Sequence, residues 1–280
     1  MTRLPRLRPV DAAVTFEFFR LRVHFRADEP LFFPPGKSAN MLRGALGAKL
    51  HKTVSASEYA RLFAPKAAGG GPSGLADRPR PFVFRAAHLD GMRIAPGAGF
   101  HFDLHLFDVQ EPARRHFENA FAQLAHVTLV QVEQEDVAIE LDDTGQSAEC
   151  LRVQFVTPTE LKAGHELVTR PEFGILFARL RDRISTLRAL YGPGPLDIDF
   201  RGMGERAALV RLSRCQLHWV ETERHSARTG QTHPLGGFTG EAEYQGSLGE
   251  FLPYLRAGQW TGVGRQTVWG KGEICFQLCC

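Results

Sequence analysis

The chain has 280 residues, 43% of them hydrophobic, and its 34 Lys and Arg against 31 Asp and Glu give a formal net charge of +3. This length can bury a full core and hold two domains, which excludes disordered and fibrous proteins. The apolar stretches are much shorter than the roughly 20 residues of a bilayer span, and the N-terminus lacks the apolar segment of a secretory signal. We therefore expect a cytoplasmic protein with no membrane attachment.

The cysteine and arginine contents indicate which kinds of binding site to expect. The five cysteines are scattered along the chain without a Cys-x-x-Cys pair, at positions 150, 215, 275, 279 and 280. This pattern favours neither a disulfide framework nor a zinc site, so we predict no metal and no cofactor. Cys275 lies in an alternating apolar run and is expected in the core. Only 6 of the 34 basic residues are Lys, and the remaining 28 are Arg, the side chain that best matches phosphate. A GC-rich genome would also enrich Arg.

Residues 16–141 predict the element order β-α-β-β-α-β. Period-two alternation predicts strands, and apolar residues three and four apart predict helices. The strands are expected at residues 16–27, 82–89, 99–109 and 128–141, and the helices at 38–50, with Ser38 as the cap, and at 111–126. Residues 67–81, rich in Gly and Pro, predict a loop.

Residues 151–278 repeat the same order after a polar, turn-rich segment at 142–147. Strands are expected at 151–156, 209–221, 237–244 and 273–278, helices at 171–191 and 247–255, and a basic loop at 201–206. We therefore predict an α+β fold with two tandem ferredoxin-like (RRM-like, split βαβ) domains, at residues 1–145 and 146–280. Their antiparallel sheets would have helices on one face, and an open sheet of this kind is a common RNA-binding surface.

Alternation within the third strand places His101, Asp103 and His105 on one face of the first sheet. Residues two apart on a strand lie about 7 Å apart at Cα, so a metal bound there would need ligands from flanking strands. We expect instead a polar face that is covered by the partner domain or by RNA.

A glycine-rich loop is predicted between the last helix and the last strand. It contains Gly262, Gly264, Gly270 and Gly272, together with Arg265, Trp269 and Lys271. Glycines let backbone N–H groups approach an anion closely, and the two cations add charge. A Rossmann or P-loop site is excluded because those loops run from a strand into a helix. The alternative is a tight turn that packs the last helix on the sheet.

Several motifs occur in a fixed order along almost the whole chain. They are residues 42–47 (LRGALG), 59–63 (YARLF), 155–159 (FVTPT), 183–191, 238–240 (FTG) and the terminal GVGRQTVWGKGE. This ordered set resembles the CRISPR-associated repeat-RNA-processing endoribonucleases of the RAMP superfamily. The resemblance implies two ferredoxin-like domains that bind the repeat of a CRISPR transcript and cut it once per repeat without metal. The 2′-hydroxyl before the cut would attack, leaving a 2′,3′-cyclic phosphate.

The resemblance also implies site residues. Family members commonly use a His near the end of the first helix, aided by Tyr or Lys, which gives His51, Lys52 and Tyr59 as catalytic candidates. His51 also suits a helix C-terminus for electrostatic reasons, and Tyr59 also fits a core position. Arg43 is added as an RNA-binding candidate, together with the four glycines, Arg265, Trp269 and Lys271 of the loop. Related sequences often carry a cysteine cluster where this chain has TVSASE.

The predicted function is therefore a metal-independent endoribonuclease that binds CRISPR repeat RNA and cleaves the precursor transcript into guide RNAs. The alternative is a non-catalytic RAMP-type subunit that holds the RNA in an effector complex. A more distant alternative is a ferredoxin-like protein with no role in nucleic-acid binding. The expected partners are repeat RNA and effector-complex subunits, and the expected state is a monomer or homodimer.

Overall fold

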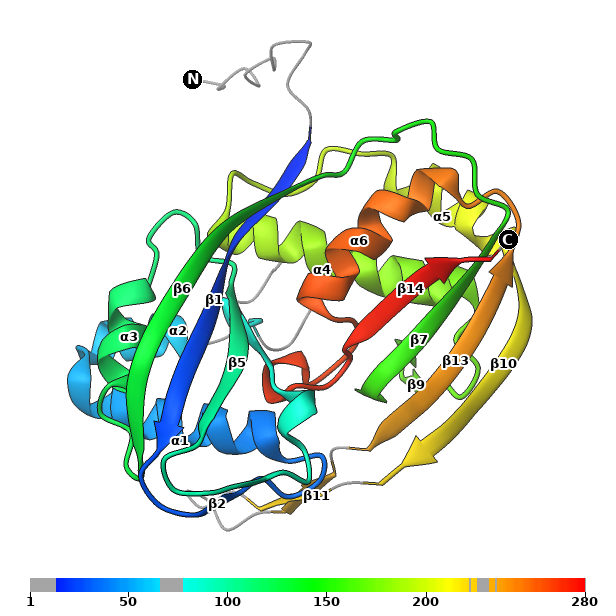
Figure 1. Ribbon diagram of the computed structural model, residues 1–280. Helices are drawn as coiled ribbons and strands as arrows, with labels where there is room; N and C mark the ends of the chain where they lie inside the picture. Colours follow the sequence, from blue (N-terminus) through cyan, green and yellow to red (C-terminus); the bar gives the residue numbers. More distant parts are fainter. Residues whose placement is uncertain (1–13, 66–77, 222, 226–231, 235, 280) are drawn as a thin grey trace, which may run out of the picture.

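A computed structural model describes residues 14–65, 78–221, 223–225, 232–234 and 236–279 (Figure 1). Most of the loop predicted at 67–81 lies outside these residues. Among the helices described, none is both long enough and apolar enough to cross a membrane.

The first four-stranded sheet is formed entirely by residues 15–140 and has the order β3-β5-β1-β6. Its strands are β1 (Thr15–Ala27), β3 (Phe82–Arg85), β5 (Gly99–Leu106) and β6 (Val127–Glu140). The helices α1 (Ser38–Thr53), α2 (Ala56–Leu62) and α3 (Arg114–Phe121) accompany this sheet, with two short strands β2 (Leu31–Phe32) and β4 (Arg93–Ile94) and a 3-10 turn η1 (Ala87–Leu89). All of the pairings within the sheet are antiparallel.

The second sheet repeats this topology with the order β10-β13-β7-β14. Its strands are β7 (Cys150–Thr159), β10 (Arg211–Val220), β13 (Gly237–Gln245) and β14 (Ile274–Leu278). The helices are α4 (Phe173–Tyr191), α5 (Phe200–Ala208) and α6 (Leu252–Thr261); the short elements are β8 (Lys162–Ala163), β9 (Glu166–Leu167), β11 (Glu223–His225), β12 (Thr232–Pro234), η2 (Gly249–Phe251) and η3 (Thr267–Trp269). In both sheets the main strands stand in the order second, third, first and fourth, so the predicted tandem ferredoxin-like fold is confirmed.

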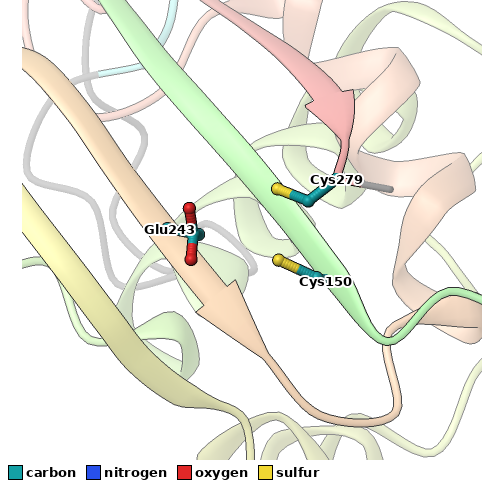
Figure 2. Close-up of side chains that lie close together, drawn as sticks. All are labelled: Cys150, Glu243 and Cys279. Atoms are coloured by element: carbon teal, nitrogen blue, oxygen red, sulfur yellow. The ribbon is translucent and has the colours of Figure 1, made fainter.

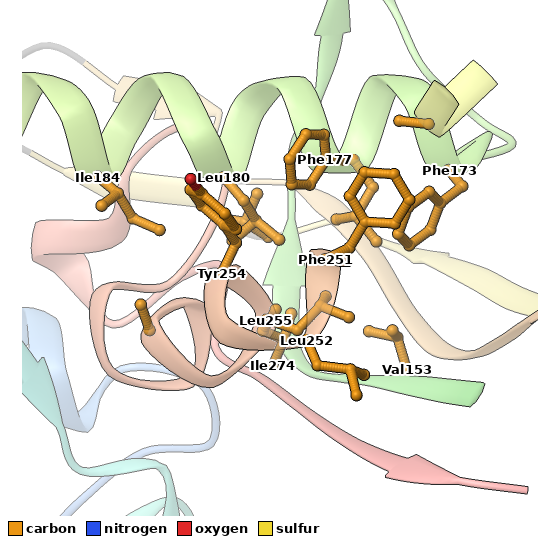
Figure 3. Close-up of a cluster of buried hydrophobic side chains, with 14 of the residues drawn as sticks. Val153, Phe173, Phe177, Leu180, Ile184, Phe251, Leu252, Tyr254, Leu255 and Ile274 are labelled. Atoms are coloured by element: carbon orange, nitrogen blue, oxygen red, sulfur yellow. The ribbon is translucent and has the colours of Figure 1, made fainter. Parts of the chain in front are cut away.

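Each sheet packs one face against its own helices. In the second half, aromatic side chains of α4 pack against those of η2 and α6, as for Phe177, whose ring lies 4.6 Å from that of Phe251 in η2 (Figure 3). Val153 of β7 and Ile274 of β14 close this core from the sheet side. The apolar residues spaced three and four apart within 173–187 thus form the buried face of α4, as the sequence predicted.

The C-terminal end of α6 joins the two halves of the protein. Trp260 packs 5.2 Å from the ring of Phe18 on β1 and 5.0 Å from the ring of His105 on β5. Phe16 and Phe18 accordingly belong to the same core cluster as the helices of the second half. Because large aromatic contacts cross between the halves, the two sheets are held together by a packed, apolar junction.

Four local predictions are wrong. The predicted loop 201–206 is helix α5, because Asp199 caps the N–H of Gly202 and Met203 is buried. The predicted helix 247–255 is a 3-10 turn followed by α6, which extends to Thr261. Ser38 is the first residue of α1 and not its cap, because its hydroxyl donates to Asp90 and accepts no hydrogen bond from a helix N–H. Cys275 is half-buried, because the inward position at this end of β14 belongs to Ile274.

Candidate active site and RNA-binding surface

The C-terminal end of α1 presents two of the predicted catalytic side chains together. His51 is exposed in the last turn of α1, and its ring lies 5.0 Å from that of Tyr59, nearly perpendicular at 85°. Tyr59 lies on α2, whose first turn is capped by the hydroxyl of Ser55. The turn between the helices thus brings the imidazole and the phenol into edge-to-face contact. Lys52 is also exposed at this helix end, so two of the three candidates are exposed and Tyr59 is half-buried.

An aromatic path leads from this pair to the glycine-rich loop. Tyr59 stacks on Phe63 at 5.4 Å, and the guanidinium of Arg43 lies 4.6 Å from the Phe63 ring centre. The guanidinium of Arg43 also lies 5.5 Å from the ring centre of Trp269. Gly47 makes the packing possible, since a Cβ there would fall 2.2 Å from the Phe63 ring. A continuous series of side-chain contacts therefore connects His51, at the end of α1, with Trp269 in the glycine-rich loop.

The glycine-rich loop is a tightly folded connection that rests on α1. All four glycines have positive φ, between 68° and 80°. A Cβ on Gly264 would meet the Glu160 carbonyl at 2.3 Å, one on Gly270 would meet Ala39 at 2.4 Å, and one on Gly272 would meet the Val263 carbonyl at 2.0 Å. The N–H groups of Gly262, Gly270 and Gly272 donate to carbonyls within the protein. Backbone conformation and close packing therefore account for these glycines without a bound anion.

The two cations of the loop have different environments. Arg265 is 58% exposed at its side chain and pairs with the carboxylate of Glu160. Lys271 is only 4% exposed, and burial, partly offset by the charge of Asp90, lowers its pKa. Arg265 is thus accessible to a phosphate, whereas the position of Lys271 suits a role in docking the loop.

Sequence reasoning missed a group of basic residues at the end of α6. Arg85 donates to the carbonyls of Gln259 and Trp260 at 3.2 and 3.0 Å, and Arg183 donates to that of Thr261 at 3.0 Å. His105 contacts the Trp260 carbonyl through Nδ1 at 2.9 Å, which makes that nitrogen the protonated one. Burial, reinforced by the charge of Arg85, lowers the pKa of His105 to about 3 and that of Arg183 to about 9. The cations Arg85 and Arg183 and the neutral His105 thus pair with the last carbonyls of α6, at the negative end of the helix. One feature of the sequence could have indicated this group, namely Arg85 at the end of the otherwise apolar strand 82–85.

The face of the first sheet that carries His101, Asp103 and His105 is polar outside the region where Trp260 packs on it, as the alternation of the sequence predicted. Arg20 and Arg22 both bind Asp103, each at 2.8 Å. Burial opposes ionisation of Asp103, but the hydrogen bonds from the two arginines hold its pKa below the usual range. Farther along, the ring of His101 lies 5.6 Å from that of His24 and 5.0 Å from that of His88. His105 is covered by the second half of the protein, whereas Arg22 remains partly exposed.

Comparison with solved structures identifies the fold. A Cas6 product complex matches with a TM-score of 0.60 and 17% identity, over 94% of this chain and 99% of the other. Thermus thermophilus Cas6 matches with a TM-score of 0.57 and 16% identity, over 95% and 100%. A chain of a partial Cas6-RT-Cas1–Cas2 complex matches with a TM-score of 0.63 and 11% identity, over 95% of this chain and 47% of that one. The fold is therefore that of RAMP-type proteins with two ferredoxin-like domains.

Family models agree with the structural comparison. Residues 153–274 match the model of the CRISPR-associated endoribonuclease Cas6, and residues 16–160 match a model described as an N-terminal domain. No curated protein matches the sequence. The Cas6 endoribonuclease model thus matches the second half of the chain, and the predicted CRISPR repeat-RNA-processing endoribonuclease of the RAMP type is confirmed.

Proposed function

We propose that this Cas6-family endoribonuclease cleaves its repeat RNA without a metal ion, using the RNA's own 2′-hydroxyl as nucleophile and His51 as general base. The observation that supports this assignment is the exposed imidazole of His51, held edge-on against Tyr59 at 5.0 Å at the end of α1. A ring that is accessible yet oriented by a neighbour can meet a substrate proton in a defined geometry. His51 is thus our candidate for the group that starts the reaction.

The proposed reaction needs three groups. His51 accepts the proton of the 2′-hydroxyl while that oxygen attacks the adjacent phosphorus, and the bond from phosphorus to the 5′-oxygen breaks. The Tyr59 hydroxyl donates a proton to the leaving 5′-oxygen, and Lys52 faces the negative charge that develops on the phosphorane. The products are a 2′,3′-cyclic phosphate and a free 5′-hydroxyl. His51 and Tyr59 then exchange a proton with solvent before the next turnover.

The loop residues divide into two proposed roles in RNA binding. Arg265, exposed at the surface of the loop, contacts phosphate. Arg43 is 5% exposed and lies between Phe63 and Trp269, so it acts as a positioning residue that orients Trp269 toward the RNA. Gly262, Gly264, Gly270 and Gly272 with Lys271 shape and dock the loop. We further propose that repeat RNA is the principal partner; binding to effector-complex subunits and the monomeric or homodimeric state stay predictions.

Cleavage of the repeat RNA in EDTA tests the proposal. The purified chain should cut the RNA at one position and leave a 2′,3′-cyclic phosphate, and a 2′-deoxy nucleotide before the cut should abolish cleavage. His51→Ala should slow the cut, whereas His165→Ala, at another exposed histidine, should not. Cleavage of the 2′-deoxy substrate would overturn the mechanism. Specific binding without any cleavage would leave the RNA-holding function of a non-catalytic RAMP-type subunit.

A further inference from the structure

Two cysteines 129 positions apart in sequence meet at the open end of the second sheet. Cys150 begins β7, and the N–H of Cys279, just after β14, donates to the Cys150 carbonyl at 3.1 Å. The pairing of Leu278 with Leu151 continues by one residue, so Cys279 stands directly opposite Cys150. Opposite residues of an antiparallel pair place their side chains on the same face. The register therefore puts both thiols side by side.

Glu243 reaches the same place from the other neighbouring strand. On β13 it pairs with Arg152, two residues along β7 from Cys150, and so shares the face of both residues. Leu151, between them, points into the core and is fully buried, so this face is the outer one. The two sulfur atoms and a carboxylate oxygen of Glu243 all lie within 4.8 Å of one another, and all three residues are half-buried (Figure 2).

This donor set matches the chemistry of zinc. Zinc takes thiolate and carboxylate ligands at about 2.3 and 2.1 Å, which spaces tetrahedral ligands roughly 3.5–3.8 Å apart. The three atoms therefore need only small side-chain rotations to surround one ion. We propose that Cys150, Cys279 and Glu243 bind a zinc ion, with solvent in the remaining coordination position. The spacing of the cysteines in the sequence predicted no metal because it does not show which strands are neighbours.

The charges around the cluster support a bound cation. A divalent cation bound by the two sulfur atoms would displace the thiol protons. Two thiolates and one carboxylate carry a charge of −3, which zinc reduces to −1. The guanidinium of Arg152, 3.6 Å from Glu243, balances the remainder.

The position of the site indicates its role. It joins β13, β7 and the end of β14, and β14 is the edge strand that follows the glycine-rich loop. An ion bound there would fasten this edge strand to the middle of the sheet. Since β14 is short, with 5 residues, a ligand link at its end would oppose fraying of the strand.

Cobalt substitution tests the proposed site directly. The reduced 280-residue protein should bind one Co²⁺ and develop a thiolate-to-cobalt charge-transfer band with the visible spectrum of tetrahedral cobalt, and Zn²⁺ should displace the Co²⁺. Zinc binding should release protons in buffered titrations and raise the melting temperature. Cys150→Ser or Cys279→Ser should weaken zinc binding by at least about 100-fold, since even residues that support a ligand are worth about 10–100-fold. Glu243→Gln should weaken it by about 10-fold or more.

Two control variants keep this test specific. Cys275→Ser removes a thiol of β14 that bonds Gln154 instead, and should leave zinc affinity unchanged. Cys280→Ser tests whether the last two cysteines of the sequence bind the ion by themselves. Loss of binding in Cys280→Ser together with full binding in Glu243→Gln would overturn the proposal. An absent charge-transfer band in the reduced protein, or a disulfide between Cys150 and Cys279 that persists in excess zinc, would do the same.

Discussion

The end of α1 and the glycine-rich loop lie at opposite ends of one aromatic path, yet they differ in almost every physical respect. At the α1 end, His51 and Lys52 are exposed and their polar atoms face solvent. In the loop, the backbone is held by hydrogen bonds, four positive φ angles and contacts too close for a Cβ. The first region is accessible, as the proposed contact with RNA requires, whereas the second packs one part of the protein against another.

This contrast separates two kinds of functional residue. A group that moves a proton must be reached by the RNA, so burial would defeat its purpose. A loop that positions another part of the protein must not move, and Gly262, Gly270, Gly272 and Lys271 are accordingly buried. Substitutions in the loop should therefore act first on stability, and substitutions at the end of α1 should act first on the rate of cleavage.

The largest effect is expected from Gly272→Ala. The new Cβ would lie 2.0 Å from the Val263 carbonyl at a φ of +68°, so the loop must rearrange. We expect a loss of about 3–5 kcal/mol in the free energy of unfolding, measured in urea. Gly97→Ala is the matched control, because its φ of +83° brings the same strain with nothing within 4 Å, and it should cost only about 1–2 kcal/mol. Equal losses of unfolding free energy in the two variants would show that the loop relaxes to accommodate the new Cβ.

His51→Ala should affect the chemical step alone. Loss of a general base typically slows a reaction by about 10²–10⁴-fold, and RNA affinity should change little because the proton moves only in the transition state. Single-turnover cleavage and filter binding measure the two quantities. Cleavage at the wild-type rate would move the general-base role to Lys52, Tyr59 or another accessible group.

The buried junction at the end of α6 predicts a pH dependence of stability. His105 has a pKa of about 3 in the folded protein, below the ordinary value of 6.5, so the unfolded chain binds the extra proton first. Stability should therefore be complete above pH 6.5 and fall by about 1.4 kcal/mol per pH unit between pH 6.5 and 3. His105→Gln should flatten this part of the profile. An unchanged slope in that variant would assign the pH dependence to other groups.

The smallest effect is expected from Arg265→Ala. The side chain is exposed, so its pair with Glu160 adds little to stability. The loss of one phosphate contact should lower the slope of log affinity against log salt by about 1. Arg201→Ala, which removes a more exposed arginine on α5, is the matched control. If both variants change the slope equally, Arg265 contributes only to the general charge of the surface.

Periodicity was sufficient for most of the fold. The apolar alternation in residues 16–27 and the stripe in 173–187 led to β1 and α4, because burial of one face dictates these patterns whatever the neighbours are. An error arose where residues that favour a helix and residues that disfavour it stand side by side. Asp199 and Met203 favour a helix at 201–206 despite two glycines, a balance that composition alone does not reveal. His51, Lys52, Tyr59 and the loop came from residue type, order and family resemblance.

The contacts between site residues that are distant in the sequence were decided only by the tertiary structure. Arg43 and Trp269 are 226 positions apart and meet because the loop docks on α1, and Arg85 reaches the carbonyls of α6 across the domain junction. Cys150, Glu243 and Cys279 come together because β7 lies between β13 and β14. A one-dimensional pattern shows which face of an element is buried, whereas strand order and domain docking depend on contacts between distant segments. The sequence therefore determined the elements and the family, and the packing of one domain on the other decided the environment of each site residue.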